Sequence, residues 1–394
     1  MILVTILSAI LVVAQSKTPP RVFLVNGKKM LESRTAYLSG DKNVKYAVQA
    51  LIKEGNKALK FLPVSIMDKE QTPPSGDKHD YISLAAYWFP DPNKPNGLPY
   101  IRNDGVRNPE VKNYKDHDNL SKMCDAVFDA SVAYYFSSEE KYADHAATLI
   151  RIWFLDEATK MNPNMKYAQA VLGRNDGRGS GVLDARDLKK IVDAVGLLEG
   201  SQALTKEDSD GLKLWMTRYF QWLTESKNGK DERDAKNNHG TWYDVQAVSI
   251  ALFLDKIEYA KERCESAKER RIASQIQPDG KQPEELARTK AISYSEFNLQ
   301  ALFELSLLAE NVGVDLWDYT GSGGQSIRKA LDYIIPYITK EKETTYKQID
   351  EIKSENIIPA LYLASLKYND ETYLSTIAKI SEKELNKNSF VVLY

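Results

Sequence analysis

Four side chains in two short stretches have the types and spacing to act together as acid, base and anion binder. The first stretch, residues 236–243, reads KNNHGTWY and places Asn238 beside His239, one of only four histidines in the chain. The second begins with Arg288, fifty residues after Asn238, and continues to Tyr294. An amide and a guanidinium can hydrogen-bond a carboxylate, while an imidazole and a phenol can transfer protons. This set suits removal of a proton from the carbon next to a sugar carboxylate, which is the chemistry of β-elimination.

Elimination from a uronic acid glycoside requires that the carboxylate be neutralised, H5 be removed and the departing O4 oxygen be protonated. Asn238 can stabilise the charge that builds on the carboxylate. His239 is the best-matched base, because the ordinary pKa of imidazole lies close to neutral pH. Tyr294 suits the acid, and it could also be the base if Arg288 lowered the pKa of its phenol. The residues alone leave open whether His239 or Tyr294 removes the proton.

The elements that must position these residues are mostly helical. From about residue 43 onward, apolar residues recur at the spacing of one buried helix face, most clearly within residues 120–128, 212–223, 299–307, 327–335 and 355–380. A short strand is expected at Arg21–Val25. Strand–helix alternation and Gly-rich phosphate loops are absent from the sequence. We therefore predict an all-α fold, an incomplete α/α toroid made of a ring of antiparallel helix hairpins, with long loops rimming the active-site cleft.

Four long segments without helical periodicity interrupt these helices, at residues 71–76, 88–113, 161–181 and 275–285. Loops of this length in a compact domain usually carry function or are disordered. Arginine and aromatic side chains are frequent in them, and Arg binds carboxylates in a planar fork while aromatic faces stack on sugar rings. The predicted substrate-binding residues from these loops are Trp88, Tyr100, Arg102, Gln169, Arg174 and Arg178. Those from the two motif stretches are Asn237, Trp242, Tyr243, Lys290 and Asn298.

Several of these residues also have a purely structural interpretation. Trp242 and Tyr243 could begin the buried face of a helix that runs to Leu254. Arg288 and Lys290 could belong to a solvated charged face. The functional interpretation gains from the co-occurrence of the two stretches with loops suited to an acidic sugar polymer.

Composition excludes several classes of partner. The chain has 394 residues, of which 43% are hydrophobic and 27% charged, as in soluble globular proteins. A formal net charge of −2 gives no global attraction to nucleic acid or an anionic membrane, so a polyanion must be drawn by a local cationic cleft. The sequence contains neither the His-x-x-x-His nor the Cys-x-x-Cys spacing of zinc sites. It also lacks the Gly-x-Ser-x-Gly motif of an activated serine. We expect no metal, no cofactor and no nucleic-acid partner.

The N-terminus indicates export. Residues 1–15 are almost entirely apolar, and the run is too short to span a bilayer, which predicts a signal peptide over residues 1–16. A buried N-terminal strand is the alternative. The mature chain, residues 17–394, is then a single periplasmic or secreted domain with no membrane span. The two cysteines make no disulfide framework, and Cys124 falls on a buried helix face.

Several motifs recur in an order that resembles the alginate-lyase superfamily of helical-toroid polysaccharide lyases, in the branch found in polysaccharide-degrading bacteria. The resemblance covers roughly residues 60–340, and its motifs are YWFPDP at 87–92, PYIR at 99–102, NPE at 108–110, MNPN at 161–164, YAQ at 167–169, GR at 173–174, GRG at 177–179, NNHGTWY at 237–243, QPEELAR at 282–288 and YSxFN at 294–298. It implies carboxylate neutralisation and a base from Asn238 and His239, and charge stabilisation and the acid from Arg288 and Tyr294. The implied substrate is a 1,4-linked uronan, above all alginate.

Two other functions remain open at this point. A glycoside hydrolase on a similar helical ring would use a pair of carboxylates, for which the loop candidates are Asp91, Asp104, Asp176, Asp184 and Glu284. Asp184 could instead cap a helix. A non-catalytic protein that binds acidic glycans would keep the cleft without turnover.

Overall fold

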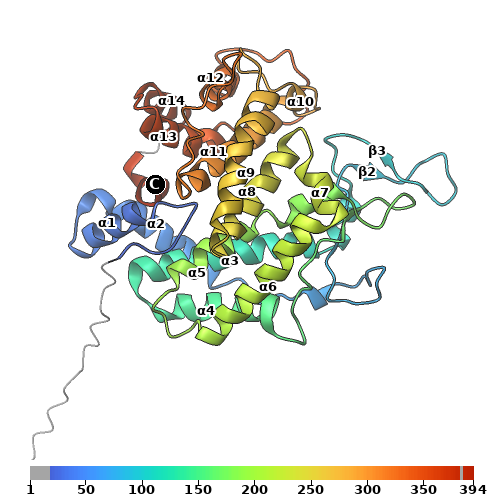
Figure 1. Ribbon diagram of the computed structural model, residues 1–394, viewed down its shortest axis with the longest axis horizontal. Helices are drawn as coiled ribbons and strands as arrows, with labels where there is room; N and C mark the ends of the chain where they lie inside the picture. The colour runs from blue at the N-terminus through green and yellow to red at the C-terminus, as the bar shows by residue number, and fades with distance from the viewer. Residues whose placement is uncertain (1–17, 382–384) are drawn as a thin grey trace, which may run out of the picture.

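A computed structural model describes residues 18–381 and 385–394, and these residues are mostly helical (Figure 1). The expected all-α class is confirmed. The predicted signal peptide, residues 1–16, lies outside the described residues. Within the described part of the chain, no helix combines the length and apolar character that a membrane span requires.

Fifteen α-helices form the bulk of the described residues. In chain order they are α1 Gly27–Leu38, α2 Lys42–Ala58, α3 Asp116–Ser137, α4 Glu140–Ile150, α5 Leu188–Leu197, α6 Lys206–Glu225, α7 Lys227–Arg233, α8 Asn238–Phe253, α9 Ile257–Ala267, α10 Pro283–Leu286, α11 Ala291–Glu310, α12 Ile327–Ile338, α13 Ile358–Lys367, α14 Thr372–Ile380 and α15 Phe390–Leu393. Short 3-10 or π segments lie between them: η1 Ile66–Asp68, η2 Pro109–Asn113, η3 Arg151–Leu155, η4 Gly179–Ala185, η5 Lys268–Ala273, η6 Ser354–Ile357 and η7 Leu385–Lys387. The predicted helical stripes fall in α3, α6, α11, α12, α13 and α14.

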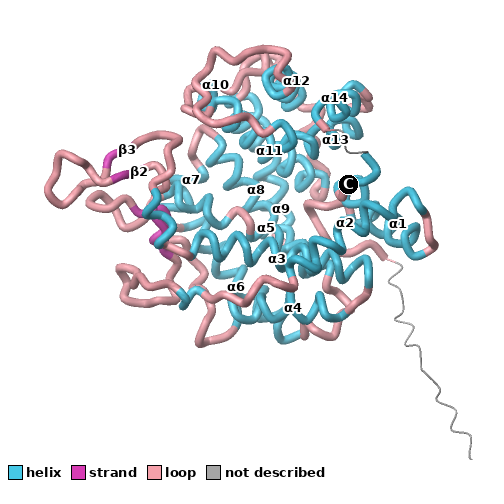
Figure 2. Tube along the Cα trace, turned by 180° about the vertical axis from the view of Figure 1, so that it is seen from behind, coloured by secondary structure: helices cyan, strands magenta, loops and turns pink. Residues whose placement is uncertain are grey.

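Helix α8 passes through the middle of the molecule (Figures 1 and 2). Every residue from Gly240 to Phe253 is buried, and the helix contacts α5, α6, α7, α9 and α11. A helix that is apolar on all sides is stable only when surrounded by other helices. Its one buried acid, Asp244, is neutralised by Arg271, whose Nε lies 2.7 Å from the carboxylate. The helix therefore holds its first residues, which include His239, in a fixed place.

Helices that follow one another in the sequence pack together, α3 with α4, α8 with α9, α11 with α12 and α13 with α14. One buried apolar cluster runs from Leu24 to Phe390 and joins almost all of these helices. Pairing of consecutive helices agrees with the predicted hairpins, and their arrangement as an incomplete toroid stays a prediction.

Two small sheets lie in the segments expected to be loops, so those segments are more ordered than the periodicity alone suggested. Strand β1 (Ile82–Leu84) pairs in parallel with β4 (Tyr167–Ala170), and β2 (Trp88–Phe89) pairs antiparallel with β3 (Ile101–Arg102). In the first, Ile82 faces Tyr167 and Leu84 faces Ala170; in the second, Trp88 faces Arg102 and Phe89 faces Ile101. Figures 1 and 2 both place β2 and β3 on the opposite side of the molecule from α1, α2 and the C-terminus.

The expected strand at Arg21–Val25 does not form. The backbone N–H groups of Phe23, Leu24 and Val25 donate to the carboxylate of Asp193 on α5, at 2.7, 3.0 and 3.1 Å. Because a side-chain carboxylate takes these donors, the segment needs no partner strand. Its apolar side chains still pack inward, which explains why the sequence resembles a strand.

Replacing Asp193 with Ala is expected to lower the free energy of unfolding by about 3 kcal/mol or more, since three buried N–H groups lose their acceptor. Asn keeps one acceptor and should cost less.

The stability that Asp193 provides should also depend on pH. Burial raises the pKa of Asp193 to about 6, although its three hydrogen bonds act to lower that pKa. Because the pKa of Asp193 is raised in the folded state, its contribution to the free energy of unfolding is greatest below the pKa of an aspartate in the unfolded chain. That contribution is lost as pH rises through about 6. Denaturant unfolding at pH 5 and pH 8 measures both effects.

Asp210→Ala is the matched control for Asp193, because Asp210 on α6 pairs only with Lys206 at the exposed surface. We expect it to change stability by less than about 0.5 kcal/mol. A change as small in Asp193→Ala would show that Asp193 does not anchor the N-terminal segment.

Candidate active site

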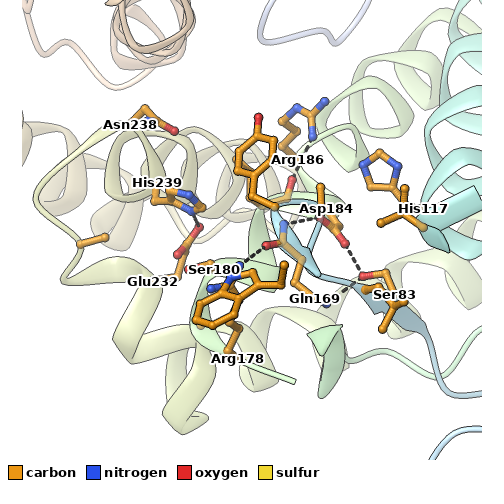
Figure 3. A pocket seen from close by; sticks show the side chains of 18 of the residues that line it. Ser83, His117, Gln169, Arg178, Ser180, Asp184, Arg186, Glu232, Asn238 and His239 are labelled. Atoms are coloured by element: carbon orange, nitrogen blue, oxygen red, sulfur yellow. Dashed lines mark hydrogen bonds and ion pairs between the residues drawn. The ribbon is translucent and has the colours of Figure 1, made fainter. Parts of the chain in front are cut away.

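A cavity of about 690 Å³ brings together all four residues predicted to be catalytic, Asn238, His239, Arg288 and Tyr294. Figure 3 shows Asn238 and His239 in this cavity. This volume is ordinary for a ligand site. Of the predicted substrate-binding residues, five also line it: Trp88, Arg102, Gln169, Arg178 and Asn237.

The first turn of α8 supplies Asn238 and His239. Asn237 caps the helix, since its side-chain oxygen accepts from the backbone N–H of His239 at 3.2 Å. Buried Glu285 then holds Asn238 twice: the backbone N–H donates to Oε1 at 2.6 Å and Nδ2 donates to Oε2 at 2.8 Å. The Oδ1 atom of Asn238 is buried without a partner. One hydrogen on Nδ2 and this free oxygen are what Asn238 can offer a ligand.

His239 is oriented by Glu232 on α7. Its Nδ1 lies 2.7 Å from Oε1 of Glu232, and because a carboxylate can only accept, the proton of this bond belongs to Nδ1 (Figure 3). The nitrogen left for proton exchange is Nε2. Burial lowers the pKa of His239, but the charges of Glu232 and Glu285 outweigh burial and raise it above the ordinary value. A raised pKa makes the imidazole a stronger base.

Arg288 is fixed by Asp104, which follows β3. Its Nε and Nη2 both donate to this carboxylate, the shortest contact being 2.8 Å. The guanidinium carbon lies 3.8 Å from the centre of the Tyr294 ring, so the cation covers the face of the phenol. Asp104 therefore already neutralises much of the charge that would act on Tyr294.

Tyr294 keeps its proton. Its hydroxyl donates to the hydroxyl of Tyr87 at 2.7 Å. Burial and this hydrogen bond raise the pKa of Tyr294 well above its ordinary value, and Arg288 opposes them only in part. The possibility that Arg288 brings the pKa of Tyr294 close to neutral pH is not met, because burial and the bond to Tyr87 outweigh the effect of the guanidinium. Tyr294 is arranged as a proton donor.

The floor of the cavity is a hydrogen-bond network around buried Asp184. Its carboxylate accepts from Tyr81, from Ser83 at 2.6 Å and from Nε2 of Gln169 at 2.8 Å. Gln169 has a φ of +50°, a backbone conformation that is uncommon outside glycine, and its N–H donates to Ser83. Its Oε1 accepts from Arg178 at 3.0 Å. Gln169 thus holds Arg178 in place, so its role is at least partly positional.

Three predicted substrate contacts lie in the core and do not line the cavity. Trp242 and Tyr243 are each 1% exposed, because α8 is packed on every side. Asn298 is fully buried on α11, where its Nδ2 donates to the side-chain oxygens of Gln275 and Gln282. These residues support the site from behind, as the structural interpretation of Trp242 and Tyr243 anticipated.

Three others lie outside the cavity for different reasons. Tyr100 is buried with its hydroxyl bound to Glu110. Arg174 donates to the carbonyl of Tyr100 and stacks on Trp88, so it supports a lining residue. Lys290 forms an ion pair with Asp350. None of these three side chains lines the cavity.

Sequence reasoning missed several residues that complete the site. Glu232 and Glu285 orient the base and the amide, Tyr87 contacts the acid, and Arg186 and His117 line the cavity. Tyr87 and Glu285 lie inside motifs already singled out, so their position was a usable signal. Glu232, seven residues before His239, carries no local signal, because it lies on α7 and a turn separates that helix from α8.

The acids considered for hydrolysis are not brought together. Among Asp91, Asp104, Asp176, Asp184 and Glu284, only Asp184 lines the cavity, and hydrogen bonds occupy both of its oxygens. Asp184 does not cap a helix, since it lies inside η4. Among the described residues, no group of three or more His, Cys, Asp and Glu side chains is arranged to hold a metal ion.

Comparisons with known proteins agree on one family. A sequence model for the family described as alginate lyase matches residues 65–344. The crystal structure of an alginate lyase from Bacteroides ovatus is 39% identical, with a TM-score of 0.90 over 95% of this chain and 99% of that one. Alginate lyase A1-III from Sphingomonas species A1 shares the fold, with 13% identity and a TM-score of 0.59 over 94% of this chain and 95% of that one. No curated protein matches the chain significantly.

Proposed function

This chain belongs to the alginate lyase family and is a polysaccharide lyase, and on that premise we propose that it cleaves 1,4-linked uronan, foremost alginate, by β-elimination. The family match confirms the resemblance seen in the motifs. One observation carries the proposal: a base, an acid, an amide and a guanidinium from α8, α11 and the segment before α11 line one cavity. A variant of alginate lyase A1-III complexed with a tetrasaccharide has the same fold, which supports an oligosaccharide as ligand.

The proposed reaction uses each group at a stated atom. Nδ2 of Asn238 donates to the carboxylate of the reacting sugar, which favours the charge that builds there. Nε2 of His239 accepts H5 as a proton, and the electrons of the C5–H bond form the C4–C5 double bond. The C4–O4 bond breaks, and O4 takes the proton of the Tyr294 hydroxyl. The products are a new non-reducing end that is unsaturated and a chain with a restored hydroxyl.

The protonation states of the free protein support this division of roles. A raised pKa keeps Tyr294 protonated and ready to donate, and Glu232 makes His239 a stronger base. A route in which Tyr294 is both base and acid requires its phenolate, which burial of the hydroxyl disfavours. That route suits mannuronate, where H5 and O4 lie on the same face, whereas guluronate needs two groups on opposite faces.

Ultraviolet absorbance tests the function directly. The C4–C5 double bond is conjugated with the carboxylate and absorbs, whereas a hydrolysis product does not. We expect absorbance to rise when the protein is incubated with alginate and not with a neutral glucan; a rise only with glucuronan would reassign the uronate. New reducing ends without absorbance would indicate a hydrolase. Saturable binding without any product would indicate a glycan-binding protein.

Glu232→Gln is expected to shift the pH profile. The His239 base must be neutral, so kcat/KM falls as pH drops through its raised pKa. Removing the Glu232 charge lowers that pKa, and the acidic limb of the profile moves to lower pH, while the maximum falls because the base is weaker. The measurement is kcat/KM on alginate from pH 5 to pH 9.

Asp231→Asn serves as the control for Glu232→Gln, since Asp231 also lines the cavity but pairs with Lys227. The acidic limb of the kcat/KM profile of Asp231→Asn should lie at the same pH as in the wild type. If His239 instead acts as a cation that binds the carboxylate, activity is lost as pH rises, and Glu232→Gln moves the alkaline limb.

A further inference from the structure

Arg186 stands out among the arginines of the cavity because, among the described residues, it has neither an ion pair nor a hydrogen bond to another side chain. Arg102 and Arg288 both pair with Asp104. No acidic side chain of residues 18–381 and 385–394 lies within ion-pair distance of Arg186. The next residue, Asp187, directs its carboxylate to a serine and a lysine instead. The charge of Asp187 acts on Arg186 only through space, so the guanidinium can still pair directly with a ligand.

Most of the hydrogen-bonding capacity of Arg186 is also free. One nitrogen, Nη1, donates to the carbonyl of Leu183 at 3.2 Å, which fixes the side chain without neutralising it. The side chain is half-buried and lines the cavity. A partly desolvated guanidinium without a counter-ion is unfavourable unless an anion arrives, and its planar fork matches a carboxylate. The other unpaired arginine, Arg178, is already tied to Gln169.

The position of Arg186 places it beside the reacting centre. Its guanidinium carbon lies 5.9 Å from the ring centre of Phe297, which also lines the cavity. Phe297 follows Tyr294 by three residues on α11, so the two share one face of that helix. In Figure 3, Asn238 and His239 stand at one side of the pocket, and Arg186 lies between them and His117.

We propose that Arg186 binds the carboxylate of the uronate next to the reacting sugar. This rests on the proposed function, in which Asn238 at the other side takes the carboxylate of the reacting sugar itself. The enzyme then requires two consecutive uronates, and a neutral sugar at the neighbouring position is a poor substrate. The preference for consecutive uronates thus comes from Arg186, a side chain that takes no part in proton transfer.

Partially carboxyl-reduced alginate provides the test, because reduction replaces some uronates by neutral hexoses next to intact ones. We expect Arg186→Met to lower kcat/KM on intact alginate by about ten- to a hundredfold, mainly by raising KM, as loss of a charge-assisted hydrogen bond predicts. At sites next to a reduced residue, the same substitution should change kcat/KM by less than about twofold, because the contact is already missing. Mass spectrometry of the products identifies those sites. Arg186→Lys, which keeps the charge, should recover part of the loss.

Arg218→Met is the control, since Arg218 is exposed on α6 and does not line the cavity. It should leave the preference for intact polymer unchanged. Equal losses for Arg186→Met on intact and reduced sites would overturn the proposal and show that Arg186 acts on the reacting sugar or on the fold; a melting temperature separates these two. If the wild type forms no unsaturated product from any uronan, the proposed function fails, and not this inference alone.

Discussion

Tyr294→Phe is expected to lower kcat on alginate by about a thousandfold, the central range for loss of a general acid. Without the hydroxyl, the departing O4 must take its proton from water in a half-buried cavity. The ring remains, so its contact with Arg288 at 3.8 Å persists and the fold is kept. Binding of an oligouronate, measured by calorimetry, should change by less than tenfold. Initial rates of ultraviolet absorbance give kcat.

Tyr333→Phe is a matched control for Tyr294→Phe, because the Tyr333 hydroxyl also bonds another tyrosine hydroxyl, that of Tyr346 at 2.8 Å, but lies on α12 away from the cavity. We expect it to retain wild-type kcat. Turnover within tenfold of wild type in Tyr294→Phe would remove this phenol from the mechanism and make a water molecule the acid.

His239→Ala is expected to have an effect that depends on the uronate. On guluronate blocks, where H5 and O4 lie on opposite faces, the base cannot be replaced by Tyr294, and kcat should fall by about a hundred- to a thousandfold. On mannuronate blocks, Tyr294 can reach both atoms, so the loss should be several times smaller. Block polymers of defined composition, assayed by absorbance, separate the two cases.

His145→Ala controls for loss of an imidazole, since His145 lies half-buried on α4 and does not line the cavity. It should preserve activity on both block types. Equal losses on guluronate and mannuronate in His239→Ala would contradict the division of roles. They would mean that one histidine serves both geometries, or that its contribution is to bind the carboxylate.

Local spacing in the sequence singled out side chains that line one cavity when those side chains lie close together in the chain. Asn238 and His239 share one helical turn, and Arg288 and Tyr294 lie six residues apart, so each pair could be recognised from local spacing. The same spacing misled for Trp242 and Tyr243. A motif records which residues occur together, but α8 turns these two rings toward the core while His239 faces the cavity.

Electrostatic roles could not be predicted in the same way, because they depend on partners far away in the chain. Arg288 could have brought the pKa of Tyr294 near neutral pH, but burial and the hydrogen bond to Tyr87, 207 residues earlier, outweigh its effect. Asp193 likewise removed an expected strand by accepting from a segment about 170 residues earlier. In each case an ion pair or hydrogen bond between distant segments reversed a conclusion drawn from neighbours.

The amino-acid sequence by itself determined the helical class, the family and the identity of the four central side chains, because helical periodicity and short motifs are local properties. Only the tertiary structure decided which of the remaining polar residues face the cavity, which arginines keep a free charge and which proton each group holds. Burial and pairing set those properties, and both arise when α7, α8, α11 and the loop that carries Asp104 come together in space.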